Sequence, residues 1–164
     1  MTTDTDHTDT SPTTSSPTAF SRRAEATFQV ASWSEELICD IDGTGTQATP
    51  EMYYPDRGLN RARVRYTWSG DLEGSSEVDY LISYNGAVAP TVGFQRFTGS
   101  LAGHDGSFVL VHTGEHDAEG VREHLRVVPG LGTGALTGLR GEAHLALTGH
   151  SDEGYRLVLA YDLD

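Results

Sequence analysis

The sequence has few of the features that mark secreted, membrane-spanning or cofactor-dependent proteins. Its single cysteine, Cys39, cannot form an internal disulfide, so nothing in the chain calls for an oxidising compartment. No run approaches the roughly 18 apolar residues of a membrane-spanning helix, and the first residues lack the basic start and apolar run of a secretory signal. We therefore expect a cytoplasmic protein.

Positive charge is also scarce. The 24 acidic residues outnumber the 11 basic ones, and the formal net charge is −13 at pH 7. A surface of this sign repels the phosphates of nucleic acids and of anionic membranes. We therefore expect neither a nucleic acid nor a membrane as a partner.

Motifs for nucleotide, metal and nucleophile chemistry are absent. Segment 129–141 is rich in glycine, but it lacks the Lys-Ser/Thr ending of a phosphate-binding loop and the βαβ unit of a dinucleotide site. No Gly-x-Ser-x-Gly elbow is present. His112 and His116 would lie about 13 Å apart along one strand, too far to share a zinc ion. A meeting of His112 with Glu142 or His144 in space is left open, and we expect no cofactor and no metal.

The first twenty residues differ in composition from the rest. They are mostly Thr, Ser, Asp and Pro, and their only large apolar residues are Met1 and Phe20. Such a segment cannot bury enough apolar surface to offset the entropy lost on ordering. We predict a disordered tail over residues 1–20 and a single β-barrel domain over residues 21–164.

From Ala24 onward, apolar residues recur at every second position, which is the pattern of β-strands. Turns that contain glycine, asparagine or aspartate separate the runs, and no apolar stripe of helical period occurs. The pattern predicts an all-β fold of about eight antiparallel strands. An up-and-down barrel is the most economical form because closure removes exposed edges, and a two-sheet sandwich is the alternative. The strands are expected near 26–31, 61–68, 77–84, 91–101, 106–116, 120–128, 142–149 and 155–163.

The turns also suggest which side chains share a face. If residues 103–105 form the turn of one hairpin, Arg96 shares a face with His112. The preceding hairpin, which turns near Gly86, then brings Asp79 beside Arg96. The result is a predicted polar cluster of Asp79, Arg96 and His112, which a shift of one residue in either register would dismantle.

Residues 43–60 interrupt the strand pattern. This long connection holds Met52, Tyr53 and Tyr54 between two prolines. Long connections in compact domains often serve as lids or binding loops. We expect these three residues to lie near a barrel mouth and to contact a ligand.

The run 107–113 is apolar on both of its faces. Phe108 and Leu110 point to one side, and Val109 and Val111 point to the other. A barrel wall needs only one apolar face, so the second is expected to meet a partner or the covering loop. We predict a homodimer.

Four segments of the sequence stand out: 68–74 (WSGDLEG), 78–84 (VDYLISY), 93–114 (GFQRFTGSLAGHDGSFVLVHTG) and 128–141 (VPGLGTGALTGLRG). In this order they resemble a family of uncharacterised bacterial proteins with an allene oxide cyclase-like barrel. The resemblance extends over residues 24–163 and implies an eight-stranded antiparallel barrel of the calycin type, often assembled as a small oligomer. That family usually carries Glu at the positions of Asp79 and Gln95.

The resemblance implies a function by analogy. Plant allene oxide cyclases, dirigent proteins and bacterial polyketide cyclases use similar barrels to enclose a reactive, mostly apolar molecule and guide its ring closure. The expectation is a cofactor-free cyclase or isomerase of secondary metabolism, acting on a mostly apolar polyketide- or lipid-like substrate. The alternative is a non-catalytic barrel that binds a small hydrophobic ligand.

Candidate residues follow from this expectation. Arg96 or His112 would donate hydrogen bonds to negative charge that develops on a substrate oxygen. Tyr80, Tyr84 or Glu142 would shuttle a proton. The residues expected to contact the substrate are Tyr66, Trp68, Asp79, Phe94 and Leu110 from the strands, and Met52, Tyr53 and Tyr54 from the long connection.

Overall fold

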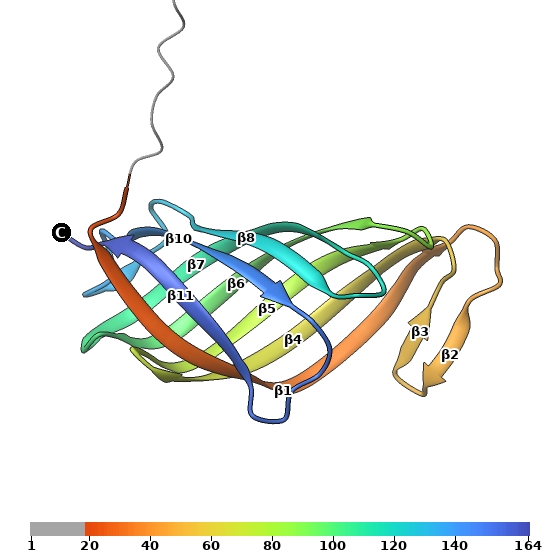
Figure 1. Ribbon diagram of the computed structural model, residues 1–164, viewed down its shortest axis with the longest axis horizontal. Coiled ribbons are helices and arrows are strands. Elements are labelled where there is room, and N and C mark those ends of the chain that lie inside the picture. Colours follow the sequence, from red (N-terminus) through yellow and green to blue (C-terminus); the bar gives the residue numbers. More distant parts are fainter. Residues whose placement is uncertain (1–18) are drawn as a thin grey trace, which may run out of the picture.

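The computed structural model describes residues 19–164, so nearly all of the tail predicted over residues 1–20 lies outside the described residues. Eight strands build the body of the molecule (Figure 1). Within residues 19–164 there is no helix of the length and apolar character that a membrane span requires. The strands are β1 (Arg22–Asp40), β4 (Gly58–Gly70), β5 (Leu72–Tyr84), β6 (Ala89–Leu101), β7 (His104–His116), β8 (Val121–Val127), β10 (Arg140–Leu147) and β11 (Tyr155–Asp162).

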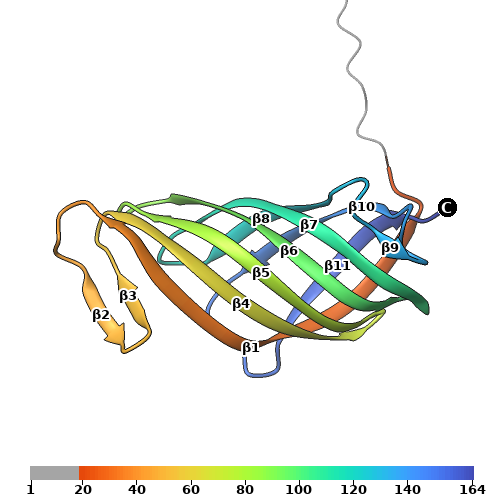
Figure 2. The same cartoon turned by 180° about the vertical axis from the view of Figure 1, so that it is seen from behind.

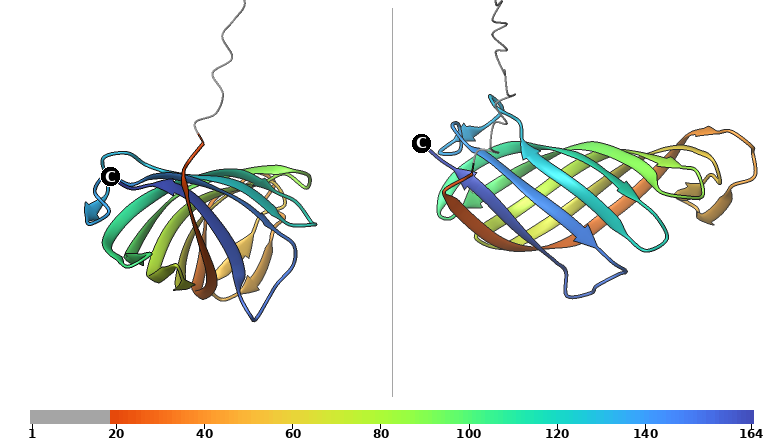
Figure 3. Two further views of the ribbon diagram at one scale, coloured as in Figure 1. Left: turned by 60° about the vertical axis from the view of Figure 1, so that its left-hand side comes forward. Right: turned by 45° about the horizontal axis from the view of Figure 1, so that its top comes forward.

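Each of these eight strands has two antiparallel neighbours. Pairing follows chain order from β4 through β5, β6, β7, β8 and β10 to β11, and β1 pairs with both β4 and β11. The sheet therefore closes on itself, as seen from behind in Figure 2 and obliquely along the barrel in Figure 3. This confirms the predicted antiparallel barrel and excludes the sandwich, because a sandwich would leave edge strands unpaired.

Alternate side chains of each strand fill the barrel. In β4 the buried residues run through every second position from Asn60 to Trp68, and the residues between them are exposed. Aromatic rings pack in the middle, where the Phe28 ring centroid lies 5.1 Å from that of Tyr66 and 4.8 Å from that of Trp68. Eight strands enclose a space just wide enough for side chains to fill. The centre of the barrel is therefore a packed core.

Different segments of the chain lie at the two ends of the barrel. At one end the glycine-rich segment 129–139 folds over the opening, with its short strand β9 (Thr133–Gly134) paired to β7 and with Leu136 and Leu139 buried in the core. At the other end β2 (Thr46–Thr49) and β3 (Met52–Tyr54) form a separate hairpin, which accounts for much of the connection expected over 43–60 (Figure 2). Leucine side chains thus close one end of the barrel, and a cavity can form only at the other end.

The turn between β6 and β7 decides which residues of these strands face inward. Ala102 and Gly103 form it with φ angles of 48° and 86°, and Leu101 pairs with His104. Positive φ at both central residues produces the two-residue turn whose twist fits an antiparallel hairpin. The three-residue turn expected at 103–105 is therefore wrong, and the register differs from the expected one by one residue.

This one-residue difference turns side chains to the opposite face, because strand side chains alternate. Arg96 pairs with Val109 on the outer wall, whereas His112 points into the barrel and is buried. Asp79 also lies on the outer wall, 3.1 Å from the guanidinium of Arg61. The predicted cluster of Asp79, Arg96 and His112 is therefore wrong, because Asp79 and Arg96 share the outer face and His112 lies on the inner one.

Candidate functional site

A cavity of about 330 Å³ occupies the barrel end opposite the leucine plug. A broader groove of about 770 Å³ crosses the outer wall of β4, β5 and β6, but exposed ion-pairing side chains such as Arg65 and Glu77 line it. The cavity is the better candidate because apolar and aromatic side chains converge in it with a few polar groups. Its principal lining residues are Trp33, Glu35, Tyr54, Tyr66, Tyr80, Ile82, Tyr84, Thr91, His116, Glu123, Leu145 and Leu147.

A buried polar network lies beneath the cavity floor and joins four neighbouring strands, β5 to β8. His112 of β7 is 2% exposed, and its Nδ1 atom lies 2.9 Å from Oε2 of Glu123 on β8. Its Nε2 atom lies 2.7 Å from Oε1 of Gln95 on β6. The Gln95 amide nitrogen donates to Ser76 Oγ at 2.6 Å. Each polar group of this network therefore has a partner inside the core.

The network fixes how many protons the His112–Glu123 pair holds. Gln95 Oε1 can only accept a hydrogen bond, so His112 Nε2 carries a proton and donates it. A second proton lies in the contact between His112 Nδ1 and Glu123, since two acceptors would otherwise face each other. The pair is then either imidazolium with carboxylate or imidazole with carboxylic acid. Both forms are neutral overall, which allows the Glu123 carboxyl group to be buried although its ion-pair partner among residues 19–164 is His112 and not an arginine.

Two tyrosine hydroxyls connect this pair to the cavity. The Tyr80 hydroxyl lies 3.5 Å from His112 Nδ1 and 3.3 Å from the Tyr66 hydroxyl. Burial raises the pKa of Tyr66 to about 12 and the pKa of Tyr80 well above its ordinary value. Both phenols are therefore protonated at neutral pH and available as hydrogen-bond donors to a molecule in the cavity.

A second carboxylate faces the cavity from β1. Glu35 is 5% exposed and accepts hydrogen bonds from the Tyr84 hydroxyl at 2.5 Å and from Trp33 Nε1 at 3.4 Å. Burial, followed by the negative charge of Glu35, raises the pKa of Tyr54 to about 12. The Tyr54 ring stands 6.0 Å from that of Tyr84, so the β2–β3 hairpin contributes one aromatic side chain to the mouth.

His116 adds a neutral imidazole on the opposite side of the mouth. Its Nδ1 atom lies 3.0 Å from the Thr91 hydroxyl, and its ring meets the Tyr84 ring edge-on at 5.4 Å. Burial lowers the pKa of His116, so this ring is uncharged at neutral pH. The cavity therefore offers phenols, a neutral imidazole and carboxyl groups within an aromatic frame, a set suited to moving protons.

The structure gathers some of the sequence-predicted residues and separates others. Tyr54, Tyr66, Tyr80 and Tyr84 line the cavity, and His112 lies directly beneath it. Trp68 and Leu110 are buried deeper in the core, and Met52 and Tyr53 belong to the β2–β3 hairpin without lining the cavity. The residues that lie on the outer wall, contrary to their expected place at the site, are Asp79, Phe94, Arg96 and Glu142.

Glu35, Gln95, His116 and Glu123 are among the site residues that were not assigned to the site from the sequence. The sequence does contain a signal that Glu123 faces inward. Glu123 lies two residues before Leu125 and four before Val127, which are buried, so all three side chains share the inner face of β8. Glu35 had no such signal. The pairing of β1 with β4 slips by one residue between Val30 and Ser32, and this bulge sets Glu35 opposite Ala62, which faces inward.

Comparisons with known proteins converge on one family. The family model described as "Protein of unknown function (DUF3224)" matches residues 24–159 of the chain. The fold is similar to that of a protein of unknown function from the DUF3224 family of Shewanella oneidensis MR-1, solved by crystallography, with 25% identity and a TM-score of 0.66. That alignment covers 87% of this chain and 98% of the other. No curated protein matches the sequence.

Proposed function

We propose that this chain, which belongs to the DUF3224 family of proteins of unknown function, acts as a cofactor-free cyclase or isomerase on a mostly apolar, polyketide- or lipid-like substrate. The observation that carries the proposal is the neutral His112–Glu123 pair, which lies beside two protonated tyrosines at the floor of an aromatic cavity. The allene oxide cyclase-like character of the barrel belongs to the same proposal and is supported by the four sequence segments.

The proposed chemistry begins with a substrate carbonyl. The Glu123 carboxylate takes a proton from the carbon next to the carbonyl, and the electron pair of the broken C–H bond moves onto the carbonyl oxygen to form an enolate. Tyr66 and Tyr80 donate hydrogen bonds to that oxygen, as donors aimed at developing charge do in other enzymes. The paired His112 imidazolium compensates the charge of Glu123 before the proton arrives.

Two outcomes follow without any oxidant or reductant. If Glu123 returns its proton to a different carbon of the enolate system, the product is an isomer. If the enolate carbon attacks a second electrophilic carbon of the same molecule, a ring forms and the proton goes to the oxygen generated there. Confinement of a flexible chain near its attack geometry can supply several kcal/mol of the barrier, roughly 7–11 in the best cases.

This scheme changes the residues expected from the sequence. His112, Tyr80 and Tyr66 keep roles at the site, and Tyr84 stays at the mouth with Glu35. Arg96 and Glu142 lie on the outer wall, so their expected roles pass to the two tyrosines and to Glu123. The barrel provides the aromatic frame, and the β2–β3 hairpin provides Tyr54 at the entrance.

The test measures enolate formation directly and needs no knowledge of the natural substrate. The protein is incubated in D₂O with apolar ketones such as α-tetralone and 2-octanone, and loss of the α-proton signal is followed by NMR. We expect exchange above the buffer rate, a decrease of about 10²-fold or more in Glu123→Gln, and no change in Glu142→Gln on the outer wall. Circular dichroism verifies that both variants are folded.

The same experiment separates catalysis from simple binding. Quenching of the fluorescence of Trp33, which lines the cavity, reports occupancy by the ketones. Binding without accelerated exchange would favour the non-catalytic ligand-binding barrel and contradict the enzymatic proposal. Absence of both binding and exchange across the ketones would contradict the cavity as a site for apolar carbonyl compounds.

A further inference from the structure

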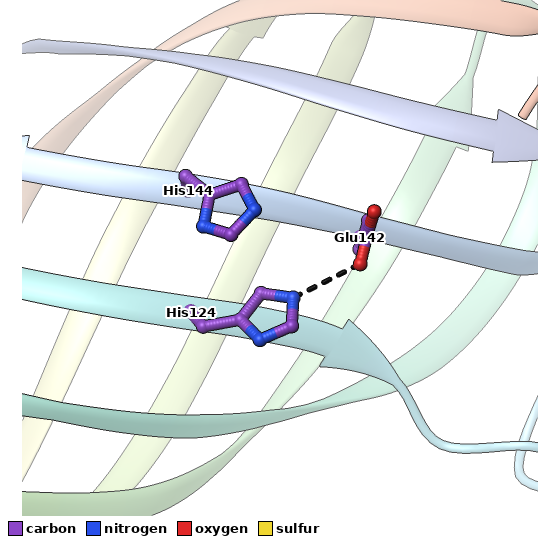
Figure 4. A group of neighbouring side chains, drawn as sticks. All are labelled: His124, Glu142 and His144. Carbon is purple, nitrogen blue, oxygen red and sulfur yellow. Dashed lines mark hydrogen bonds and ion pairs between the residues drawn. The ribbon is translucent and has the colours of Figure 1, made fainter. Parts of the chain in front are cut away.

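A second cluster of chemically capable side chains lies on the outer wall of the barrel, away from the cavity. His124 of β8 is directly opposite His144 of β10 in the strand register, and Glu142 precedes His144 by two residues. Residues two apart on a strand point to the same face, so all three side chains share the outer face (Figure 4). Two ordinary strand relations, a cross-strand pair and a same-strand neighbour, therefore build the cluster.

The three side chains are already close enough to bind one ion. Each can place one ligand atom so that all three atoms lie within 4.8 Å of one another. His124 Nε2 is 3.0 Å from Glu142 Oε2, and the two imidazole rings are stacked with centroids 4.5 Å apart and planes 9° apart. Figure 4 shows the Glu142 carboxylate turned toward the His124 ring.

We propose that His124, Glu142 and His144 form a surface site for a divalent transition-metal ion, with Zn²⁺ as the simplest occupant. Two imidazoles and one carboxylate are a ligand set that zinc uses when a fourth position stays open. Metal–ligand bonds of about 2.0–2.2 Å place the ligand atoms of a tetrahedral site about 3.4 Å apart. Rotation of the exposed His144 and the half-buried His124 and Glu142 side chains covers the remaining difference, and the paired strands hold the backbone in place.

The electrostatic setting favours a cation. The protein carries a formal net charge of −13, which raises the local concentration of cations at its surface. Binding also replaces the hydrogen bond between His124 and Glu142 with two bonds to the metal. The positive charge that would disfavour a cation is that of Arg126, which is directly opposite Glu142 in the pairing of β8 with β10. The open fourth position would accept water or a donor atom of another molecule.

This site is independent of the proposed enzymatic function. His124 follows Glu123 directly on β8, and successive strand residues point to opposite faces. Glu123 therefore serves the cavity and His124 serves the outer wall. Loss of the metal site would leave the ketone exchange of the cavity unchanged, so failure of one proposal does not decide the other.

Calorimetric titration of tag-free, metal-stripped protein with Zn²⁺ tests the proposal. We expect one ion per chain, and at least about tenfold weaker binding in His144→Ala, since even residues that only orient metal ligands cost 10- to 100-fold. Glu142→Gln, which keeps the side-chain shape and removes the charge, is expected to weaken binding by a similar factor. Substitution with Co²⁺ should give the visible absorption of a four-coordinate site.

His150 supplies the matched control. Its Nε2 atom lies 2.8 Å from Asp152 Oδ1, so it forms a histidine–carboxylate pair with the same chemistry as that of His124 and Glu142 but with greater exposure. Within the described residues no third ligand joins it in a metal-binding group. His150→Ala should therefore leave zinc affinity unchanged. No zinc binding, or equal binding by the wild type and His144→Ala, would overturn the proposal and leave a metal-free surface pair.

Discussion

Among single residues, Gln95 determines how the hydrogen bonds of the buried polar network are oriented. Its amide accepts from His112 Nε2 at 2.7 Å and donates to Ser76 Oγ at 2.6 Å, and Trp68 Nε1 donates to the same hydroxyl at 2.8 Å. The orientation of this one amide determines that His112 donates through Nε2. It thereby determines that the buried pair of His112 and Glu123 is neutral.

Removal of this amide should destabilise the barrel. Gln95→Leu leaves the His112 N–H without an acceptor in the core, which costs about 1–3 kcal/mol of the free energy of unfolding. Urea denaturation measures the change. Thr98→Ala, at an exposed position of the same strand, should change the free energy by less than about 0.5 kcal/mol. Equal losses in the two variants would contradict the network as a source of stability.

The buried tyrosines link stability to alkaline pH. Burial raises the pKa of Tyr66 to about 12 and that of Tyr80 well above its ordinary value, whereas tyrosines of an unfolded chain titrate near 10. Above about pH 10 the unfolded chain therefore binds fewer protons than the folded one, and the free energy of unfolding falls as pH rises toward about 12. The contribution is fully present below pH 10.

Urea midpoints at about pH 9 and about pH 11 measure this effect, since they lie on either side of the unfolded pKa. We expect a clear decrease in the wild type and a smaller one in the variant with both Tyr66→Phe and Tyr80→Phe, because phenylalanine does not titrate. An identical decrease in both proteins would show that other groups cause the alkaline loss of stability.

Segment 129–139 acts at the scale of an element by closing one end of the barrel. Leu136 is fully buried and Leu139 nearly so, whereas Leu131 of the same segment is 50% exposed. Leu136→Ala should lower the free energy of unfolding by about 2–5 kcal/mol, since it opens a cavity in the core. Leu131→Ala should cost less than about 0.5 kcal/mol. Thermal or urea unfolding measures the free energy of unfolding of both variants. Similar small losses in the two would contradict the role of Leu136 in plugging the barrel.

At the scale of the whole molecule, the outer wall carries an apolar strip. Leu81 pairs with Val92, and Phe94, which is 60% exposed, pairs with Val111. Val109 and Val111 lie on this outer face and Phe108 and Leu110 on the inner one, as the alternation of that run predicted. The homodimer stays a prediction, and this strip is the surface that it would cover.

Light scattering at micromolar concentration tests the dimer. We expect the mass of two 17.7-kDa chains for the wild type, and a single chain for Phe94→Ser, because the substitution removes the largest apolar side chain of the strip. Arg96→Ser, two residues along the same face, is the matched control and should remain dimeric. A monomeric wild type would contradict the prediction.

The pattern of neighbouring residues along the sequence determined where most strands and turns of this protein lie. The period-two alternation and the turns between the runs predicted the eight barrel strands, because a strand with one buried face repeats every second residue. The same alternation grouped Tyr66 with Val64 on one face of its strand and Tyr80 with Val78 on one face of the next, and in the structure these four residues are buried inside the barrel. Each of these inferences needed only residues adjacent along the chain.

The register of the paired strands and the closure of the barrel depended on the tertiary structure. The hydrogen-bond ladder of a sheet involves only the backbone, so a strand can shift by one residue without losing ladder bonds, and turns and bulges choose the register. The turn at Ala102–Gly103 put Arg96 outside, and the bulge after Val30 put Glu35 inside. The pairing of β8 with β10 brought His124 to His144. No local pattern encodes this last pairing, because the path of the segment that connects β8 to β10 depends on the completed barrel.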